Sequence, residues 1–274
     1  PTPYFFSARV FGQIDLVSIE LQKVYRQTDP VFVSVLDHIR TNTAGAADLQ
    51  LLNTRYGSQI EESEADMYIT LATRRDTVDS INEKKLAELP GDSITFEGVI
   101  EGDFRKQVCL LHKSLYSNRC TNHLHQNDSN RRWVNGTIGV IAGIDEEEEN
   151  DLRHHRRWKE CDVKLESMAK YPLPLQRKNK RIEEEVLGSF TQYPIRLAWA
   201  ITVHKSQGLT FSRVVIDFTG GVFAGGQAYV ALSRCTSLDG IQLKKPVNRA
   251  DVFVRPEIVN LPDASTTAKP STKP

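Results

Sequence analysis

The feature that most constrains the fold is a compact β-rich run followed at once by an amphipathic stretch. The run ADMYITLAT (65–73) predicts a buried strand, and RRDTVDSINEKKLAEL (74–89) predicts a helix. A strand followed by a helix is the building block of a parallel sheet, so we expect an α/β domain. The same rhythm returns after residue 193, where four segments predict helix, strand, helix and strand: IRLAWAITVHK (195–205), SRVVIDF (212–218), AGGQAYVALSRCTSL (224–238) and GIQL (240–243).

An earlier helix is predicted in TDPVFVSVLDHIRTN (28–42). Asp29 can cap it, and Pro30 suits the first helical position. The apolar residues that then fall on one face are Phe32, Val35, Leu36 and Ile39.

The middle of the chain, from about residue 92, changes character. SITFEGVIEGDF (93–104) predicts short strands, and Asn135-Gly136 between apolar runs is a strong hairpin-turn signal. We expect a small antiparallel β insertion here.

Composition narrows the function less than the motifs do. The 274 residues are 39% hydrophobic and 26% charged, with a formal net charge of zero, which neither supports nor excludes nucleic-acid binding. Apolar runs stay short of a membrane span, and four cysteines without a disulfide-like pattern fit a reducing compartment. Because the chain starts without Met, in sequence typical of mid-domain, we expect a fragment.

The most informative stretch is AWAITVHKSQGLTF (198–211), predicted as a helix-to-loop junction. It offers hydroxyls, an imidazole and an ammonium group to a phosphate backbone, and Gly208 allows a close backbone approach. A polar helix end with a glycine cap explains the same residues equally well. Arg234, after the apolar face of 228–232, is either a surface charge or an arginine finger aimed at a γ-phosphate.

Together, TVHKSQGLTF and YVALSRCTSLDGI resemble motifs V and VI of superfamily 1 DNA helicases. The closest resemblance is to the petite-integration-frequency (Pif) type, which is related to RecD and moves 5′ to 3′. Upstream, 19–40 resembles the motif IV region, 70–82 the next DNA-contacting motif, and 127–141 the hairpin of the family's small β-barrel insertion.

The resemblance implies roles for particular residues. Arg26 and Arg234 would reach the γ-phosphate as catalytic arginines, and Gln27, Gln207 and Gly208 would lie beside the nucleotide. The residues implied to face DNA are Thr73, Thr202, His204 and Lys205. The implied cofactors are ATP and Mg²⁺ in a full-length motor, neither bound strongly by this chain alone. No metal ligands are implied for the chain itself.

The implied architecture is the second RecA-like motor domain, with an inserted antiparallel β-barrel. Residues 1–91 and 191–262 would form the RecA-like part, 92–190 the barrel, and 263–274 a disordered tail. Single-stranded DNA would be the partner, with ATP shared with a first RecA-like domain. We expect an intracellular monomer that binds no membrane, at the nucleoid if bacterial, with roles in DNA repair, recombination and telomere maintenance.

One departure from the family is decisive. A helicase motor needs G-x-x-x-x-G-K-[ST] and an acidic pair for Mg²⁺, and neither is present. The glycine-rich run GGVFAGG (220–226) lacks the Lys-Ser/Thr. The chain therefore resembles the C-terminal half of a helicase, and we expect it to be inactive in isolation.

The resemblance breaks in three blocks, at about 105–126, 151–158 and 168–178. Read one nucleotide later, NRCTNHLHQ (118–126) can give TGAQIIFIK, DLRHHRRW (151–158) can give IYVITDDG, and MAKYPLPLQR (168–177) can give WRNIRYRYNE. One offset restores family-like sequence in all three blocks. We infer local frame shifts, and we expect the barrel to lose strands there.

The same blocks hold a group with zinc-like spacing: Cys109, His112, Cys120, His123, His125, His154 and His155. A cluster produced by an out-of-frame reading has no selected ligand geometry, so we do not predict a metal site. Two alternatives stay open: a non-enzymatic DNA-binding remnant of a decayed helicase gene, and a zinc-binding adaptor that depends on Cys109 to His125 alone.

Overall fold

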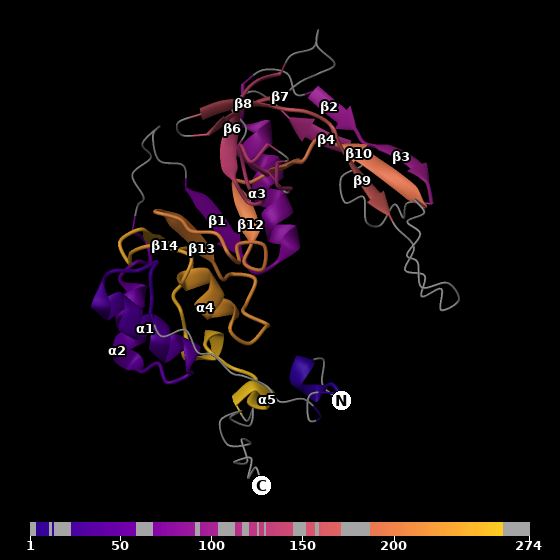
Figure 1. The fold of residues 1–274 in the computed structure, drawn as a ribbon. Coiled ribbons are helices and arrows are strands. Elements are labelled where there is room, and N and C mark those ends of the chain that lie inside the picture. The colour runs from indigo at the N-terminus through magenta and orange to yellow at the C-terminus, as the bar shows by residue number, and fades with distance from the viewer. Residues whose placement is uncertain are drawn as a thin grey trace. The chain divides into compact units, whose positions relative to one another are not determined.

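The computed structural model describes residues 4–10, 13, 23–58, 68–90, 94–103, 113–116, 121–124, 126–128, 130–144, 152–156, 159–170 and 187–259. The chain divides into two compact units. Unit 1 comprises Pro1–Ile60 and Thr210–Pro274, and unit 2 comprises Glu61–Leu209. The two units are described separately below, with the element labels of Figure 1.

The first helix of unit 1, α1 (Pro30–Arg40), confirms the sequence prediction. Asp29 Oδ1 accepts a hydrogen bond from the Val31 backbone N–H at 2.9 Å, and a proline opens the helix. The side chains it buries are the predicted ones: Phe32, Val35, Leu36 and Ile39. They pack toward α4, so this apolar face holds the unit together.

Unit 1 also contains a parallel strand pair joined through a helix. The strands β13 (Val214–Asp217) and β14 (Ile241–Leu243) pair in parallel, and α4 (Gln227–Leu232) lies between them in sequence. All four β13 residues are buried. The prediction of strand, helix and strand is confirmed, although α4 is shorter than expected. Gly226, at its N-cap with a positive φ of 78°, fixes where it begins, and a turn starts at Ser233. The other elements among the described residues of unit 1 are η1 (Phe5–Ser7), α2 (Ala46–Asn53), η3 (Arg249–Asp251) and α5 (Pro256–Val259).

Unit 2 contains the predicted strand and helix as β1 (Ile69–Ala72) and α3 (Arg75–Ala87). Strand β1 is wholly buried and pairs in parallel with β12 (Ala200–Thr202). Helix α3 lies alongside both strands (Figure 1). The Asn82 side chain attaches it, donating to the Ala200 carbonyl at 3.0 Å and accepting from the Ala200 N–H at 2.9 Å.

The prediction of a helix over 195–205 is wrong. This segment forms two strands, β11 (Ile195–Leu197) and β12, and then a turn. A short apolar run fits a buried helix or a buried strand equally well, and the backbone pairing of β12 with β1 decides between them. Residues 198–211 are therefore a strand-to-turn junction and not a helix-to-loop junction.

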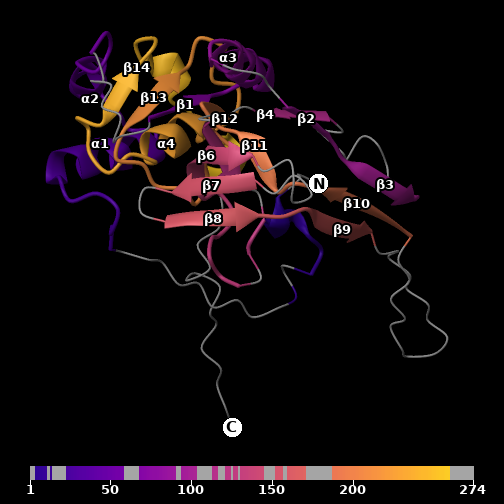
Figure 2. The same cartoon turned by 90° about the horizontal axis from the view of Figure 1, so that it is seen from above.

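The β-rich part of unit 2 forms three antiparallel sheets. Their strand orders are β2-β4, β3-β10-β9 and β11-β5-β6-β7-β8. The strands are β2 (Ile94–Glu97), β3 (Val99–Gly102), β4 (Lys113–Tyr116), β5 (Thr121–Leu124), β6 (Ile138–Ile144), β7 (Leu152–Arg156), β8 (Lys159–Val163), β9 (Glu166–Lys170) and β10 (Gly188–Gln192). Figure 2 shows β7 beside β8, and β9 beside β10.

The predicted barrel does not close among these described strands. Closure requires that the last strand of a sheet pair with the first, and the five-stranded sheet instead ends on β11 and β8. The prediction of lost strands is also wrong, since β4, β5, β7 and β9 fall wholly or partly in the three anomalous blocks. Backbone pairing needs no particular side chain, so a shifted reading frame still permits strands.

The Asn135-Gly136 turn forms, with Gly136 at φ 86°, but it is not a two-residue hairpin. Strand β6, which follows it, pairs with β5 and not with the residues just before the turn. The φ of 86° is a backbone conformation that favours glycine, and a Cβ atom at position 136 would also meet the end of the Leu209 side chain. The core of this part contains Leu86, Leu124, Trp133, Ile141, Val163, Tyr193 and Ile195.

Candidate nucleotide and nucleic-acid sites

Arg26 and Gln27 lie in unit 1, in the extended segment that leads into α1. Arg26 donates from Nε to Thr210 Oγ1 at 2.9 Å and from Nη1 to the Ser233 carbonyl at 3.1 Å. The buried amide of Gln27 donates to the Ser233 carbonyl at 2.9 Å and to the Cys235 carbonyl at 2.7 Å. The two residues are thereby attached to the turn that follows α4.

Arg234 lies in that same turn. Its Nε donates to the Val230 carbonyl and its Nη2 to Ser233 Oγ, both at 2.9 Å. Partial burial and then the nearby Arg26 lower the pKa of its guanidinium group. Unit 1 therefore brings Arg26 and Arg234 together, and two adjacent guanidinium groups favour a bound anion.

Thr73 and Thr202 lie in unit 2, at the carboxyl ends of the paired strands β1 and β12. The Thr202 Cα is the ladder partner of Ala72, and the Val203 N–H donates to the Ala72 carbonyl at 2.9 Å. Thr73 is 3% exposed, and its buried Oγ1 has no hydrogen-bond partner among the described residues. Thr202 is half-buried, and its Oγ1 accepts from the Lys205 N–H at 3.4 Å.

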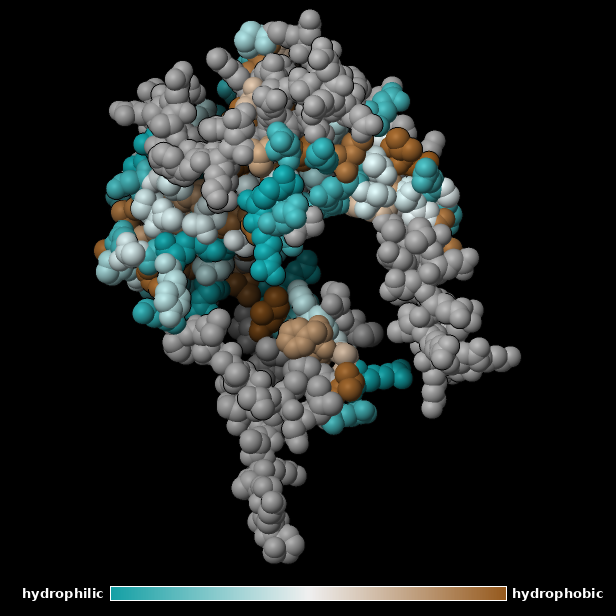
Figure 3. All heavy atoms as spheres, turned by 45° about the horizontal axis from the view of Figure 1, so that its top comes forward, coloured by the Kyte–Doolittle hydropathy of each residue, from teal (hydrophilic) through white to brown (hydrophobic). Residues whose placement is uncertain are grey.

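His204 and Lys205 are exposed in the turn after β12. The surrounding protein removes part of the hydration of the Lys205 ammonium group, and this, followed by Arg196 and Arg75, lowers its pKa. Asp79 acts in the opposite direction and raises this pKa. Positive charges therefore gather beside the carboxyl ends of β1 and β12, where α3 begins. Figure 3 shows hydrophilic residues gathered on the same face, in the region of α3.

Gln207 and Gly208 end this turn, and both are exposed. Gly208 has a φ of 86°, and a Cβ atom there would meet nothing within 4 Å. The backbone conformation, not crowding, therefore favours glycine at this position. These two residues belong to unit 2, whereas Arg26, Gln27 and Arg234 belong to unit 1.

Sequence reasoning missed several residues that contact the predicted ones. Thr210 and Ser233 accept hydrogen bonds from the arginines, and the charges of Arg75 and Asp79 shift the pKa of Lys205. Thr210 lies within the stretch 198–211, and Arg75 is the second residue of the predicted helix 74–89, so both positions were available. The carbonyl of Ser233 has no side-chain signature that could have marked it.

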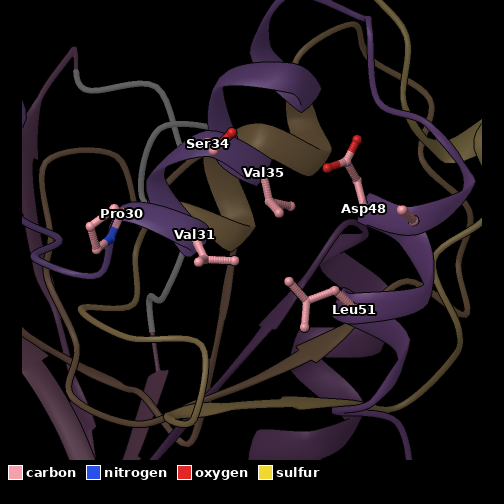
Figure 4. A pocket seen from close by; sticks show the side chains of 7 residues that line it. Pro30, Val31, Ser34, Val35, Asp48 and Leu51 are labelled. Carbon is pink, nitrogen blue, oxygen red and sulfur yellow. The ribbon is translucent and has the colours of Figure 1, made fainter.

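A separate pocket of about 420 Å³ lies between α1 and α2. Its lining residues are Pro30, Val31, Ser34, Val35, Ala47, Asp48 and Leu51, most of them labelled in Figure 4. Asp48 accepts hydrogen bonds from Gly45 N–H and interacts with His38 Nδ1 at 3.0 Å. None of the predicted site residues lines this pocket.

The zinc alternative depends on residues that lie largely outside the described ranges. Cys109, His112, Cys120 and His125 lie outside the described residues, as does the tail from residue 260. Within the described ranges, no three His, Cys, Asp or Glu residues form a group suited to a metal ion. In those same ranges, no helix is both long and apolar enough to cross a membrane.

Comparison with known proteins identifies the relatives of this chain. The ATP-dependent DNA helicase PIF1 of Emericella nidulans is 29% identical over 310 residues, which cover 94% of this chain and 41% of that protein. The chain is a homologue of the Pif1 helicases. Unliganded Pif1 from Bacteroides sp. superposes with a TM-score of 0.78 at 29% identity, and covers 96% of this chain. A Bacteroides Pif1 complex with ADP-AlF3 and single-stranded DNA gives 0.73 at 30% identity.

Two further findings concern the extent of this similarity. No protein-family model matches the chain. The chain spans about two fifths of the length of that fungal Pif1 and 61% of unliganded Bacteroides Pif1. The parallel strand pairs and the Pif1 neighbours together support a RecA-like α/β fold.

Proposed function

We propose that this chain supplies the C-terminal half of an ATP-dependent 5′-to-3′ DNA helicase. The observation that carries the proposal is the junction in unit 1. There, residues 26 and 234, 208 positions apart in sequence, place two guanidinium groups around the Ser233 turn. Such paired arginines stabilise charge on a phosphoryl group in transfer.

The two units would divide the work. Arg26 and Arg234 would reach the γ-phosphate, with Gln27 holding the Ser233 turn that presents them. Gln207 and Gly208, in unit 2, would lie beside the nucleotide and connect it to DNA. ATP and Mg²⁺ would be held mainly by a first RecA-like domain, because this chain has no phosphate-cradling G-x-x-x-x-G-K-[ST] sequence.

Unit 2 would contact single-stranded DNA through the cluster at the carboxyl ends of β1 and β12. Lys205 and His204 are exposed there and suit phosphate contacts. Thr202 adds a hydroxyl at the same edge. The contact of the buried Thr73 with DNA stays a prediction, as do the monomeric state, the intracellular location and the roles in repair, recombination and telomere maintenance.

A non-enzymatic DNA-binding remnant is the second candidate, and the three blocks that read as frame-shifted favour it. One experiment separates the two. The chain is mixed or fused with the P-loop half of a Pif1 helicase, and ATP turnover stimulated by single-stranded DNA is measured. The enzyme proposal expects turnover from the assembled motor and none from the isolated chain. Turnover by the isolated chain, or an assembled motor that stays inactive, would count against it.

A further inference from the structure

The start of α3 carries an ion pair that faces solvent. Arg75, its first residue, lies with Nε 3.4 Å from Oδ2 of Asp79, one turn further along. The Arg75 side chain is 61% exposed and that of Asp79 is 54% exposed. Both partners can therefore exchange this contact for another ligand.

The pair is poorly placed to stabilise the helix. A cation in the first turn opposes the helix dipole, and an Arg preceding an acid by four residues is the less favourable order for such pairs. Asp76 already supplies a first-turn carboxylate, which accepts from the Thr77 N–H at 2.8 Å. Helix stability alone therefore gives little reason for Arg75 and Asp79 to occupy these positions.

Arg75 lies two residues after Thr73, at the carboxyl end of β1, and the turn that contains Lys205 follows the paired strand β12. Arg75 and Arg196 both disfavour the charged form of Lys205, and Asp79 favours it. Among the charged groups that shift the pKa of Lys205, Asp79 is the acid, and it offsets the effect of these cations. Its carboxylate contacts one of these cations, Arg75, so an arriving anion would compete with it for that guanidinium group.

We propose that Asp79 is a built-in competitor for the phosphate group that this cluster binds: its carboxylate engages Arg75 until a nucleic-acid phosphate displaces it. This inference rests on the proposed contact of unit 2 with DNA. Asp79 would weaken that contact in the resting chain and allow fast exchange of successive phosphates.

The test compares two variants of the full chain that remove the same charge from the same helix, Asp79→Asn and the exposed control Glu83→Gln. Binding to an oligothymidylate is measured over a salt series. Asp79→Asn should tighten binding by about two- to fivefold at low salt, the range expected of an exposed ion pair. Glu83→Gln should change it less. Adding Arg75→Gln to Asp79→Asn should remove the gain.

Three outcomes would overturn the inference. Equal gains from both variants would indicate a net-charge effect, and weaker binding of Asp79→Asn would show that Asp79 positions Arg75 for the ligand. The third outcome is that Asp79→Asn gains as much affinity for inorganic phosphate, measured by phosphorus NMR, as for the oligonucleotide. This would assign the site to a free anion and not to nucleic acid.

A second measurement does not involve DNA. Because Asp79 raises the pKa of Lys205, its removal should leave more neutral amine and speed acylation of Lys205 at about pH 8, detected by peptide mass spectrometry. Glu83→Gln should leave this rate unchanged. If the chain binds no oligonucleotide, the proposed DNA contact fails. If Lys205 reactivity is the same in Asp79→Asn, the inference about Asp79 fails.

Discussion

Two arginines, one in each unit, experience opposite surroundings. In unit 2, Arg132 forms a two-pronged contact with Asp128, at 3.0 Å from Nε and 2.7 Å from Nη2, and lies 4.5 Å from the centre of the Trp133 ring. The Asp128 hydrogen bond raises the pKa of Arg132. In unit 1, Arg234 donates to a neutral carbonyl and a neutral hydroxyl, while burial and Arg26 lower its pKa.

The difference distinguishes a structural arginine from one that we propose acts on a nucleotide. Asp128 has a side chain only 2% exposed, so the Arg132 charge compensates a carboxylate that the fold has already buried. Arg234 lies where positive charge is disfavoured, and an anion entering there would relieve the repulsion from Arg26. Residue type alone would not distinguish the two.

The largest effect is expected from Arg234→Ala in an intact motor that carries this segment. Turnover should fall by about 10³–10⁵, because the arginine would stabilise charge on the transferring phosphoryl group. Affinity for single-stranded DNA should stay nearly unchanged, as should both properties in the exposed control Lys244→Ala. A large loss of DNA affinity with ATP turnover preserved would reverse the assignment.

Arg132→Ala should act on stability instead. It leaves Asp128 buried without its partner, which should lower the free energy of unfolding by about 3–5 kcal/mol. Urea denaturation of the chain measures this, with Arg234→Ala as the comparison, expected to lose much less. Similar losses in the two variants would erase the distinction between the arginines.

Restoring the family-like reading should stabilise the unit that contains Arg132. Position 154 is the ladder partner of the fully buried Ile141 on β6, and the alternative reading places isoleucine there. His154→Ile should therefore raise the free energy of unfolding by roughly 1.5–3 kcal/mol, which is the contribution expected from burying one such side chain. The control is His155→Thr at the next ladder position. The metal hypothesis would be reopened by two results together. Restoring the family-like sequence would leave the denaturant midpoint unchanged, and the 109–125 segment of the original chain would be protected from proteolysis.

Gln27→Ala tests how the Arg234 region is held. The amide donates to two carbonyls, and losing both bonds in a buried position should cost about 1–3 kcal/mol. Turnover of an intact motor should fall as well, because Arg26 shares the Ser233 carbonyl. Gln27→Glu, of the same shape, should fail to rescue either property. Lost stability with full turnover would separate Gln27 from the arginine site.

The smallest effect concerns acid. Hydrogen bonding from Arg132 lowers the pKa of Asp128 from 3.8 to about 2. A carboxyl group with a depressed pKa stabilises the fold above its ordinary pKa, and this stabilisation disappears as pH falls from about 4 toward 2. Unfolding of the chain across this window should be less pH-dependent in Asp128→Asn. An identical pH profile would show that the ion pair does not form.

Sequence reasoning succeeded where local signals agree. Asp29, Pro30 and the apolar spacing after them define α1, and the buried run of β1 followed by α3 needs no long-range information. It failed at 195–205, because β12 becomes a strand only through pairing with β1, about 130 residues earlier in the chain.

The candidate site shows a similar division. Arg26 and Arg234 were found through resemblance to helicase motifs, since each is an ordinary surface residue by spacing alone. The acceptors were not found: Thr210 Oγ1 and the Ser233 carbonyl for Arg26, and the Val230 carbonyl and Ser233 Oγ for Arg234. A backbone acceptor is present at every residue, so only the fold reveals which one an arginine uses.

The discontinuous make-up of unit 1 has a consequence for synthesis on the ribosome. Gln27 must wait for Ser233, 206 residues later, before its amide can bond. At about 5–20 residues per second, that interval lasts roughly 10 to 40 s. Throughout it, the apolar face of α1 lacks α4, whereas residues 61–209 are all made before Ser233 and can fold first. The order of translation therefore favours unit 2 as the first to form, and the arginine pair is assembled last.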